Sequence, residues 1–162
     1  MGHAIECRIN CEDPKNDFLP SCGVVKVLQE PTNEHTKVRI DTGFVQGDEI
    51  TSYYDPLLSK IIAHGETRTE AIEKMQRALL EYQVLGVPTN INFHKRILKN
   101  KAFQDRSYDT NFIVDEAHDL FKVKDELSEK KMGRIAVTKV FLETLKYRVN
   151  RQTEIDPWEK RD

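Results

Sequence analysis

The sequence predicts an α+β fold in which a mainly antiparallel sheet is packed against helices. Up to about residue 65, short segments alternate apolar and polar residues and are joined by turn-rich connections. This is the pattern of half-buried antiparallel strands. From Thr67 onward the apolar residues recur every three or four positions, which is the period of an amphipathic helix. The 162 residues, 38% of them hydrophobic, are enough for one core with a polar surface.

The first strand is expected at residues 3–11. Ile5, Cys7 and Ile9 point to one face there, and Glu6 and Arg8 point to the other. The same alternation, or a short apolar run between turn residues, predicts four further strands. They lie at residues 24–28, 37–41, 49–54 and 57–64, and the last is apolar enough to be central.

A helix is predicted to begin after Thr67, because Thr67 and Glu70 have the spacing of a capping box. Gly86 and Pro88 are expected to end this helix. Thr89 or Asn90 can cap a second helix. The apolar residues assigned to the two helices are Ala71, Ile72, Met75, Ala78, Leu79 and Tyr82, then Ile91, Ile97 and Leu98.

The composition changes to charged helical sequence after Ile113. One face carries Ala117, Leu120, Phe121 and Lys124, and a further helix is expected at residues 135–149. We therefore predict a domain at residues 2–114. Residues 115–162 are predicted to be a helical linker that leads into a further region of a longer protein.

Charge and composition exclude several classes of protein. The formal net charge is −2 and no long basic run occurs, so no nucleic-acid partner is expected. No apolar stretch approaches the ~20 residues that span a bilayer, so no membrane partner is expected either. The three cysteines and the lack of a secretory signal fit free thiols in a reducing compartment.

No complete set of catalytic motifs is present. The sequence has no Gly-rich phosphate loop, no nucleophile elbow and no metal-binding histidine cluster. His3, Cys7 and Cys11 do not suggest a metal site, because strand residues four apart lie ~13 Å apart. We therefore predict no metal ligands, and the five histidines are interpreted as structural or surface residues.

Two segments carry candidate chemistry. Arg8 lies on the polar face of the first strand, where Glu6 is ~7 Å away along the chain. By composition alone this is a surface ion pair worth ~0.5 kcal/mol. The second segment is Tyr53-Tyr54-Asp55-Pro56, at the entrance to the central strand.

Several long motifs in register resemble the biotin carboxylase C-terminal domain. The similarity covers residues 2 to about 114. The motifs are GHAIECRINCEDP (2–14), FLPS (18–21) with Gly23, YYDPLLSKIIAHGETR (53–68), GVPTNI (86–91) and DTNFI (109–113).

This resemblance implies a ligase. In this family ATP activates bicarbonate as carboxyphosphate, and CO2 is captured by N1 of biotin on a mobile carrier domain. The module that holds ATP and magnesium lies upstream in such proteins and is absent from this sequence. We therefore expect a fragment of a biotin carboxylase that is inactive alone. The alternative is a non-catalytic module for dimerisation and subunit docking.

The resemblance also implies roles for four residues. Arg8 matches the arginine that faces the ureido oxygen of biotin and stabilises its enolate-like form, which makes it the catalytic candidate. Asp55 matches an aspartate beside the same biotin pocket. Arg39 resembles an arginine at the family's dimer interface, and Thr110 falls near a position that borders adenine.

The implied partners are the upstream ATP-grasp portion, the biotin carboxyl carrier domain, a second copy in a homodimer and a carboxyltransferase subunit. The helical tail and the string GVPTNINF (86–93) favour a methylcrotonoyl-CoA-type subunit. Propionyl-CoA, acetyl-CoA and pyruvate carboxylases remain alternatives. The expected location is the cytoplasm in bacteria and the mitochondrial matrix in eukaryotes.

Overall fold

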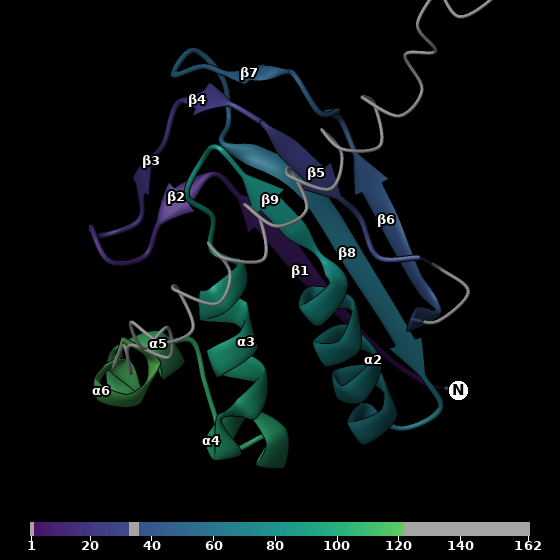
Figure 1. Ribbon diagram of the computed structural model, residues 1–162. Coiled ribbons are helices and arrows are strands. Elements are labelled where there is room, and N and C mark those ends of the chain that lie inside the picture. The colour runs from purple at the N-terminus through teal and green to yellow at the C-terminus, as the bar shows by residue number, and fades with distance from the viewer. Residues whose placement is uncertain (1, 33–35, 122–162) are drawn as a thin grey trace, which may run out of the picture. The chain divides into compact units, whose positions relative to one another are not determined.

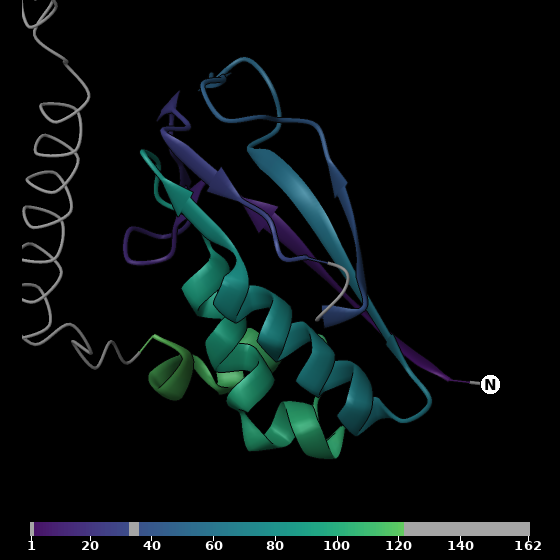
Figure 2. The ribbon, with the colours of Figure 1, turned by 45° about the vertical axis from the view of Figure 1, so that its right-hand side comes forward.

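The computed structural model describes residues 2–32 and 36–121 (Figure 1). It confirms the predicted α+β class. Three long strands form an antiparallel sheet, and the helices lie together on one side of it (Figure 2). The strands of this sheet are β1 (His3–Asn10), β8 (Leu57–Gly65) and β6 (Val38–Thr42).

The central strand is β8, as the apolar run at residues 57–64 predicts. The strand order is β1-β8-β6, so within residues 2–32 and 36–121 β1 pairs with a strand on one side only. Arg8 of β1 is opposite Lys60 of β8, which is opposite Asp41 of β6. Because paired residues share a face of the sheet, these three charged side chains form one row. The register of β1 and β8 shifts between Ile9 and Asn10, because Ile9 pairs with Ser59 and Asn10 with Leu57, so that Leu58 of β8 is the extra residue.

The opposite face of the sheet is covered by α2 (Arg68–Glu81). The apolar residues predicted from its helical period are buried there against Ile5, Cys7 and Ile9 of β1 and Ile61 and Ala63 of β8. Burying each large aliphatic side chain contributes ~1.5–3 kcal/mol. This packing fixes which face of β1 is exposed, and hence the direction of Arg8.

Thr67 caps α2, as predicted, and its hydroxyl accepts a hydrogen bond from the Glu70 amide at 3.2 Å. In a capping box the Glu70 carboxylate would also accept a hydrogen bond from the backbone amide of Thr67, and here it uses a different amide. The Glu70 carboxylate accepts from the Glu66 amide at 2.8 Å, one residue before the cap. Glu70 also pairs with Lys74 at 2.7 Å, and both contacts lower the pKa of the Glu70 carboxyl.

The segment predicted as one strand at residues 24–28 is divided in two. The first half is β4 (Gly23–Val24), which pairs with β7 (Glu49–Ile50). The second half is β5 (Val27–Gln29), which pairs with β9 (Gln83–Leu85). The division occurs because the chain changes partners: the Val25 amide donates to Asp48 and the Lys26 amide donates to Leu85.

Two other predicted bounds also change. The strand predicted at residues 49–54 is only two residues long, because residues 52–54 form a turn. The helix predicted to run to Gly86 ends at Glu81, and β9 lies between Glu81 and Gly86. A short strand pair, β2 (Glu12–Asp13) with β3 (Leu19–Pro20), completes this region.

A second apolar cluster lies among the remaining helices, with Phe93, Phe112 and Leu120 buried in it. These helices are α3 (Ile91–Lys99), α4 (Lys101–Asp105), α5 (Phe112–Asp115) and α6 (Ala117–Leu120). The predictions did not include α4 and α5. Lys124 and the helix expected at residues 135–149 lie outside the described residues.

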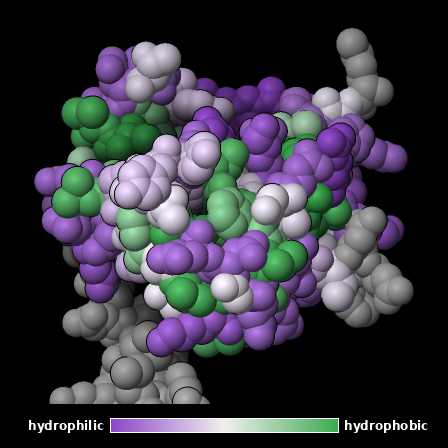
Figure 3. All heavy atoms as spheres, turned by 90° about the horizontal axis from the view of Figure 1, so that it is seen from above, coloured by the Kyte–Doolittle hydropathy of each residue, from purple (hydrophilic) through white to green (hydrophobic). Residues whose placement is uncertain are grey.

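Seen from above, the surface mixes hydrophilic and hydrophobic residues (Figure 3). The exposed large apolar side chains include Val24, Val45 and Leu85. None of the helices in residues 2–32 and 36–121 has both the length and the apolar character that a membrane crossing requires.

Candidate functional site

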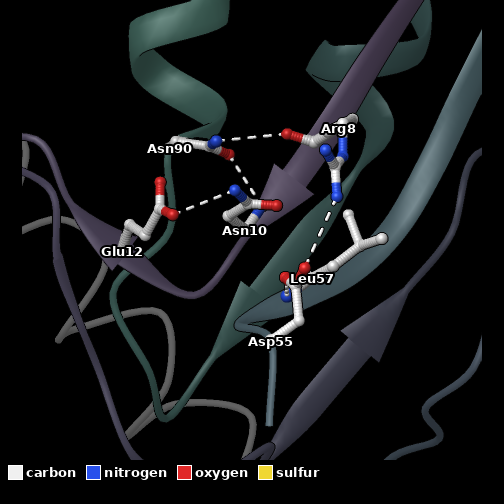
Figure 4. Close-up of polar contacts among 6 residues, drawn as sticks. All are labelled: Arg8, Asn10, Glu12, Asp55, Leu57 and Asn90. Atoms are coloured by element: carbon white, nitrogen blue, oxygen red, sulfur yellow. Dashed lines mark hydrogen bonds and ion pairs between the residues drawn. The ribbon is translucent and has the colours of Figure 1, made fainter.

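Arg8 and Asp55 lie together at the end of the sheet, although they come from different segments. An Nη of Arg8 is 3.6 Å from the Asp55 carboxylate, and the two side chains are 55% and 64% exposed (Figure 4). The partner of Arg8 is therefore Asp55, not Glu6 as the strand spacing suggested. The pair is open to solvent and not buried in packing.

Backbone contacts hold Asp55 in place. Its carboxylate accepts a hydrogen bond from the Leu57 amide at 2.9 Å, which is an Asx turn at the entrance to β8. The carbonyl of Pro56 accepts from the Cys11 amide at 2.8 Å. The loop that carries Asp55 is thus joined to the chain just after β1, the strand that carries Arg8. Tyr53 and Tyr54 of the same loop are exposed.

Asn90 binds β1 on the edge opposite β8. Its side-chain amide donates to the Arg8 carbonyl at 3.1 Å and accepts from the Asn10 amide at 3.0 Å (Figure 4). Its backbone amide donates to the Asn10 carbonyl at 3.2 Å. Asn90 precedes α3, as predicted, but its side chain makes no capping hydrogen bond to that helix.

Two more side chains join this network. His94, one turn into α3, places its Nε2 at 2.9 Å from the Arg8 carbonyl. Burial lowers the pKa of His94, partly opposed by the hydrogen bond to Arg8 and by the charge of Glu12. The Asn10 side chain donates to the Glu12 carboxylate at 3.0 Å. The Oδ1 of Asn10 is buried and has no hydrogen-bond partner among the described residues.

Sequence reasoning did not identify Asn90 and His94 as parts of this site. Asn is the residue type expected at a helix N-cap, so periodicity offers no second role for Asn90. His94 stands alone on a helix and has no spacing signal. Only the tertiary contact between α3 and β1 reveals them.

The structure does not bring Arg39 or Thr110 to the Arg8–Asp55 pair by any described contact. Arg39 makes a two-pronged pair with Asp41, at 2.8 and 2.9 Å, and both are exposed. The register nevertheless puts Arg39 on the same sheet face as Glu6 and Arg8. Thr110 lies on the exposed segment between α4 and α5.

The donor set at Arg8 fits a neutral carbonyl or an oxyanion. A guanidinium has five N–H donors, and at 3.6 Å the contact with Asp55 leaves donors directed at solvent. A ureido oxygen is an acceptor of the size that this group can bind.

Over residues 2–32 and 36–121, no three His, Cys, Asp or Glu side chains converge as metal ligands.

The class of protein follows from the fold and from the sequence comparison together. The model of the biotin carboxylase C-terminal domain family matches residues 6–115, and the chain belongs to this family.

Particular relatives are carboxylases, which are ligases. A pyruvate carboxylase subunit of Methanothermobacter thermautotrophicus is 46% identical over 112 residues, which cover 69% of this chain. The alpha chain of mitochondrial methylcrotonoyl-CoA carboxylase of Dictyostelium discoideum is 33% identical over 157 residues, or 97% of this chain. The match accounts for 22% of the length of each relative.

Solved structures share the fold. The biotin carboxylase domain dimer of Hydrogenobacter thermophilus 2-oxoglutarate carboxylase, in complex with MgADP, ADP and bicarbonate, has a TM-score of 0.71 at 35% identity. That similarity covers 76% of this chain and 27% of the solved chain. Multifunctional pyruvate carboxylase of Rhizobium etli has a TM-score of 0.70 at 38% identity, over 76% of this chain and 12% of the other.

Proposed function

We propose that this chain forms the biotin-facing side of a biotin carboxylase site within a larger protein. The observation that carries the proposal is the exposed Arg8 guanidinium, held beside Asp55 but not enclosed by it. Both residues lie in motifs that resemble those of the family. The interpretation of Arg8 as a simple surface ion pair does not explain why backbone and side-chain contacts converge on this strand end.

The chemical role of Arg8 is to stabilise negative charge. Removing the N1 proton of biotin places charge on the ureido oxygen, and a guanidinium facing that oxygen favours the enolate-like form. A unit charge ~4 Å from a developing oxyanion contributes ~4 kcal/mol at an effective dielectric near 20. An exposed ion pair contributes ~0–1 kcal/mol. Because these two energies differ by several kcal/mol, mutation of Arg8 can distinguish a guanidinium that faces the ureido oxygen from a surface ion pair.

Asp55 is proposed to orient Arg8. A carboxylate on one side of the guanidinium limits its rotation, while the Asx turn keeps that carboxylate fixed. The two residues thus act together on the biotin side, with Arg8 as the group that contacts the ureido oxygen.

Nucleotide chemistry is assigned to the ATP-grasp portion expected upstream. The match to 22% of each curated relative supports a larger protein around this chain, and the MgADP complex of the Hydrogenobacter thermophilus domain supports nucleotide binding by such a protein. Thr110 is proposed to border the adenine and Arg39 to lie at a homodimer interface.

The remaining partners are proposed from the relatives. The domain is taken as residues 2–114, and residues 115–162 are proposed to lead toward the carrier and carboxyltransferase-docking parts. The Dictyostelium discoideum match spans 157 residues, against 112 for the pyruvate carboxylase of Methanothermobacter thermautotrophicus, which supports a methylcrotonoyl-CoA-type subunit. Mitochondrial and bacterial relatives support the matrix or the cytoplasm as the location.

The experiment compares this chain alone with a fusion. In the fusion, residues 6–115 replace the matching region of biotin carboxylase 1 of Bacillus subtilis, which is 41% identical over 112 residues. We expect bicarbonate- and biotin-dependent ATP hydrolysis by the fusion and none by the chain alone. Such hydrolysis by the chain alone would overturn the fragment assignment. A folded, dimeric but inactive fusion would favour the docking-module alternative.

A further inference from the structure

We propose that Asn90 and His94 are positioning residues that fix the β1 backbone at Arg8 and so aim its guanidinium. The role of Arg8 toward biotin rests on the proposed function. The structural part of the inference, that these two side chains order Arg8, stands independently of it.

The free edge of β1 needs hydrogen-bond partners. Within the described sheet β1 pairs only with β8, so alternate backbone groups on its other edge face away from the ladder. The Arg8 carbonyl and the Asn10 amide are two such groups, because residues two apart in a strand point to the same edge. Left unpaired, this edge would be the least restrained part of the strand.

The Asn90 side chain takes the place of a neighbouring strand at this edge. A primary amide presents a donor and an acceptor in one plane, as a peptide group does. Asn90 uses the donor on the Arg8 carbonyl at 3.1 Å and the acceptor on the Asn10 amide at 3.0 Å. Its own backbone amide adds a third bond, to the Asn10 carbonyl. Asn90 is only 6% exposed, so these bonds are shielded from competing water.

His94 adds a second donor to the Arg8 carbonyl. A carbonyl oxygen can only accept, so the Nε2 at 2.9 Å must carry a proton. The lowered pKa of His94 keeps the ring neutral near pH 7, which leaves Nδ1 unprotonated and selects a single tautomer. The Arg8 carbonyl therefore receives two side-chain donors from the start of one helix.

These contacts matter for Arg8 because its other described restraint, the ion pair with Asp55, acts only at the end of the side chain. Its side chain is exposed, and its described ion pair is longer than a hydrogen bond. The direction of the side chain is then set jointly by its backbone and by the ion pair with Asp55. The β1–β8 register shifts beside Arg8, where Leu58 of β8 has no partner on β1, and the bonds from Asn90 hold Arg8 and Asn10 on either side of that shift.

The test uses NMR on the full 162-residue chain with four variants. His94→Leu removes the donor to Arg8, while His94→Gln replaces it with an amide of similar reach. Asn90→Ala removes the bridge. Asn100→Ala is the matched control, because Asn100 caps α4 and binds Glu116 but does not contact β1. The readouts are the order of the Arg8 Nε–Hε group and the exchange rate of the Asn10 amide.

We expect His94→Leu and Asn90→Ala to lower the order of the Arg8 Nε–Hε group. Asn90→Ala should also raise Asn10 amide exchange by about tenfold, as the loss of one net hydrogen bond predicts. His94→Gln and Asn100→Ala should resemble the unmodified chain. If Asn90→Ala does not fold, the two His94 variants decide. Unchanged Arg8 order in His94→Leu would overturn the proposal.

Activity of the fusion described above separates this inference from the proposed function. His94→Leu should lower kcat by about tenfold with an unchanged KM for ATP, because misaimed catalytic groups lose rate. His94→Gln should restore most of it. If Arg8→Ala lowers kcat but His94→Leu and Asn90→Ala do not, positioning is wrong and the biotin role stands. If Arg8→Ala has no effect, the proposed function fails, and the NMR result alone judges the positioning.

Discussion

The hydroxyl groups of Ser59 and Tyr82 lie 2.8 Å apart in the core, where they join the central strand to the end of α2. Burial raises the pKa of Tyr82 to about 12, so the phenol stays protonated and can donate. Each hydroxyl satisfies the other in a site that excludes water. Removing one leaves its partner unsatisfied, which costs more than removing both.

Tyr82→Phe should therefore lower the free energy of unfolding by ~1–3 kcal/mol. Ser59→Ala should do the same, and the double variant should cost less than the sum of the two. Urea denaturation of the four proteins measures this cycle. Additive single effects would show that the two hydroxyls do not depend on each other.

The sequence was sufficient to predict the layers of the fold. Strand alternation in β1 and helical spacing in α2 are local signals, and they correctly placed Ile5 and Cys7 in the core and Arg8 outside. The strands that were divided or missed depend on distant partners. β9 is three residues long and depends on its pairing with β5. A local stretch of sequence does not show this pairing, because the two strands are far apart along the chain.

The candidate site was only partly predictable for the same reason. Motif resemblance indicated Arg8 and Asp55 separately, but their approach depends on the loop before β8 meeting the end of β1. Strand spacing favoured Glu6 as the partner, since the sequence shows only neighbours along one strand. The helix start at Asn90 was predicted, whereas the hydrogen bond from its side chain to the Arg8 carbonyl, 82 residues away, was not.

Thiol reactivity should differ sharply among the three cysteines. Burial, with a smaller effect of Glu6, raises the pKa of Cys7 to about 12, and burial with Glu12 raises that of Cys11 to about 11. Cys22 is exposed. Because the thiolate is the reactive form, a disulfide reagent at pH 8 should modify one thiol in the folded chain and three in denaturant.

Cys22→Ser provides the control for this labelling experiment. It should abolish the fast reaction and leave two thiols that react only after unfolding. Rapid modification of Cys7 or Cys11 in the folded chain would contradict the burial of these two residues in the core.

Gly86 should not tolerate a side chain. Its φ is +110°, and an added Cβ would collide with the Val24 carbonyl and lie 2.9 Å from the Lys26 amide. Gly86→Ala should lower the free energy of unfolding by ~2 kcal/mol or more, since strained φ and a backbone clash act together. Gly43→Ala is the matched control, because a Cβ at Gly43 meets nothing within 4 Å. Equal melting temperatures for the two variants would refute the close approach.

His94 should make the stability of the chain depend on pH. Its pKa is lowered in the folded state, chiefly by burial, so below pH ~6.5 the unfolded state binds a proton that the folded state does not. The stabilisation is complete above pH ~6.5 and is lost as the pH falls toward the folded pKa. The loss approaches ~1.4 kcal/mol per pH unit at most. His94→Gln should show a shallower decline in unfolding free energy between pH 7.5 and 5; an identical decline would remove His94 as the cause.

Arg8 should act on the rate of biotin carboxylation and not on nucleotide binding. In the fusion, Arg8→Ala should lower kcat by ~10²- to 10³-fold, the usual cost of removing one well-placed charge stabiliser. The KM for ATP should barely change, because the nucleotide is assigned to the other portion. Arg8→Lys should rescue only in part, since an ammonium on a flexible stem cannot reproduce a planar fork of donors.

Asp55→Asn, which keeps the size of the side chain but removes its charge, should give a smaller loss of kcat than Arg8→Ala because it only loosens the guanidinium. The side chain of Arg8 is 55% exposed, so its removal should leave the melting temperature nearly unchanged. Measurements of kcat, of the KM for ATP and of melting temperature for each variant decide the matter. Near-normal carboxylation by Arg8→Ala, or a loss that merely follows a collapsed fold, would leave Arg8 as a surface ion pair and no more.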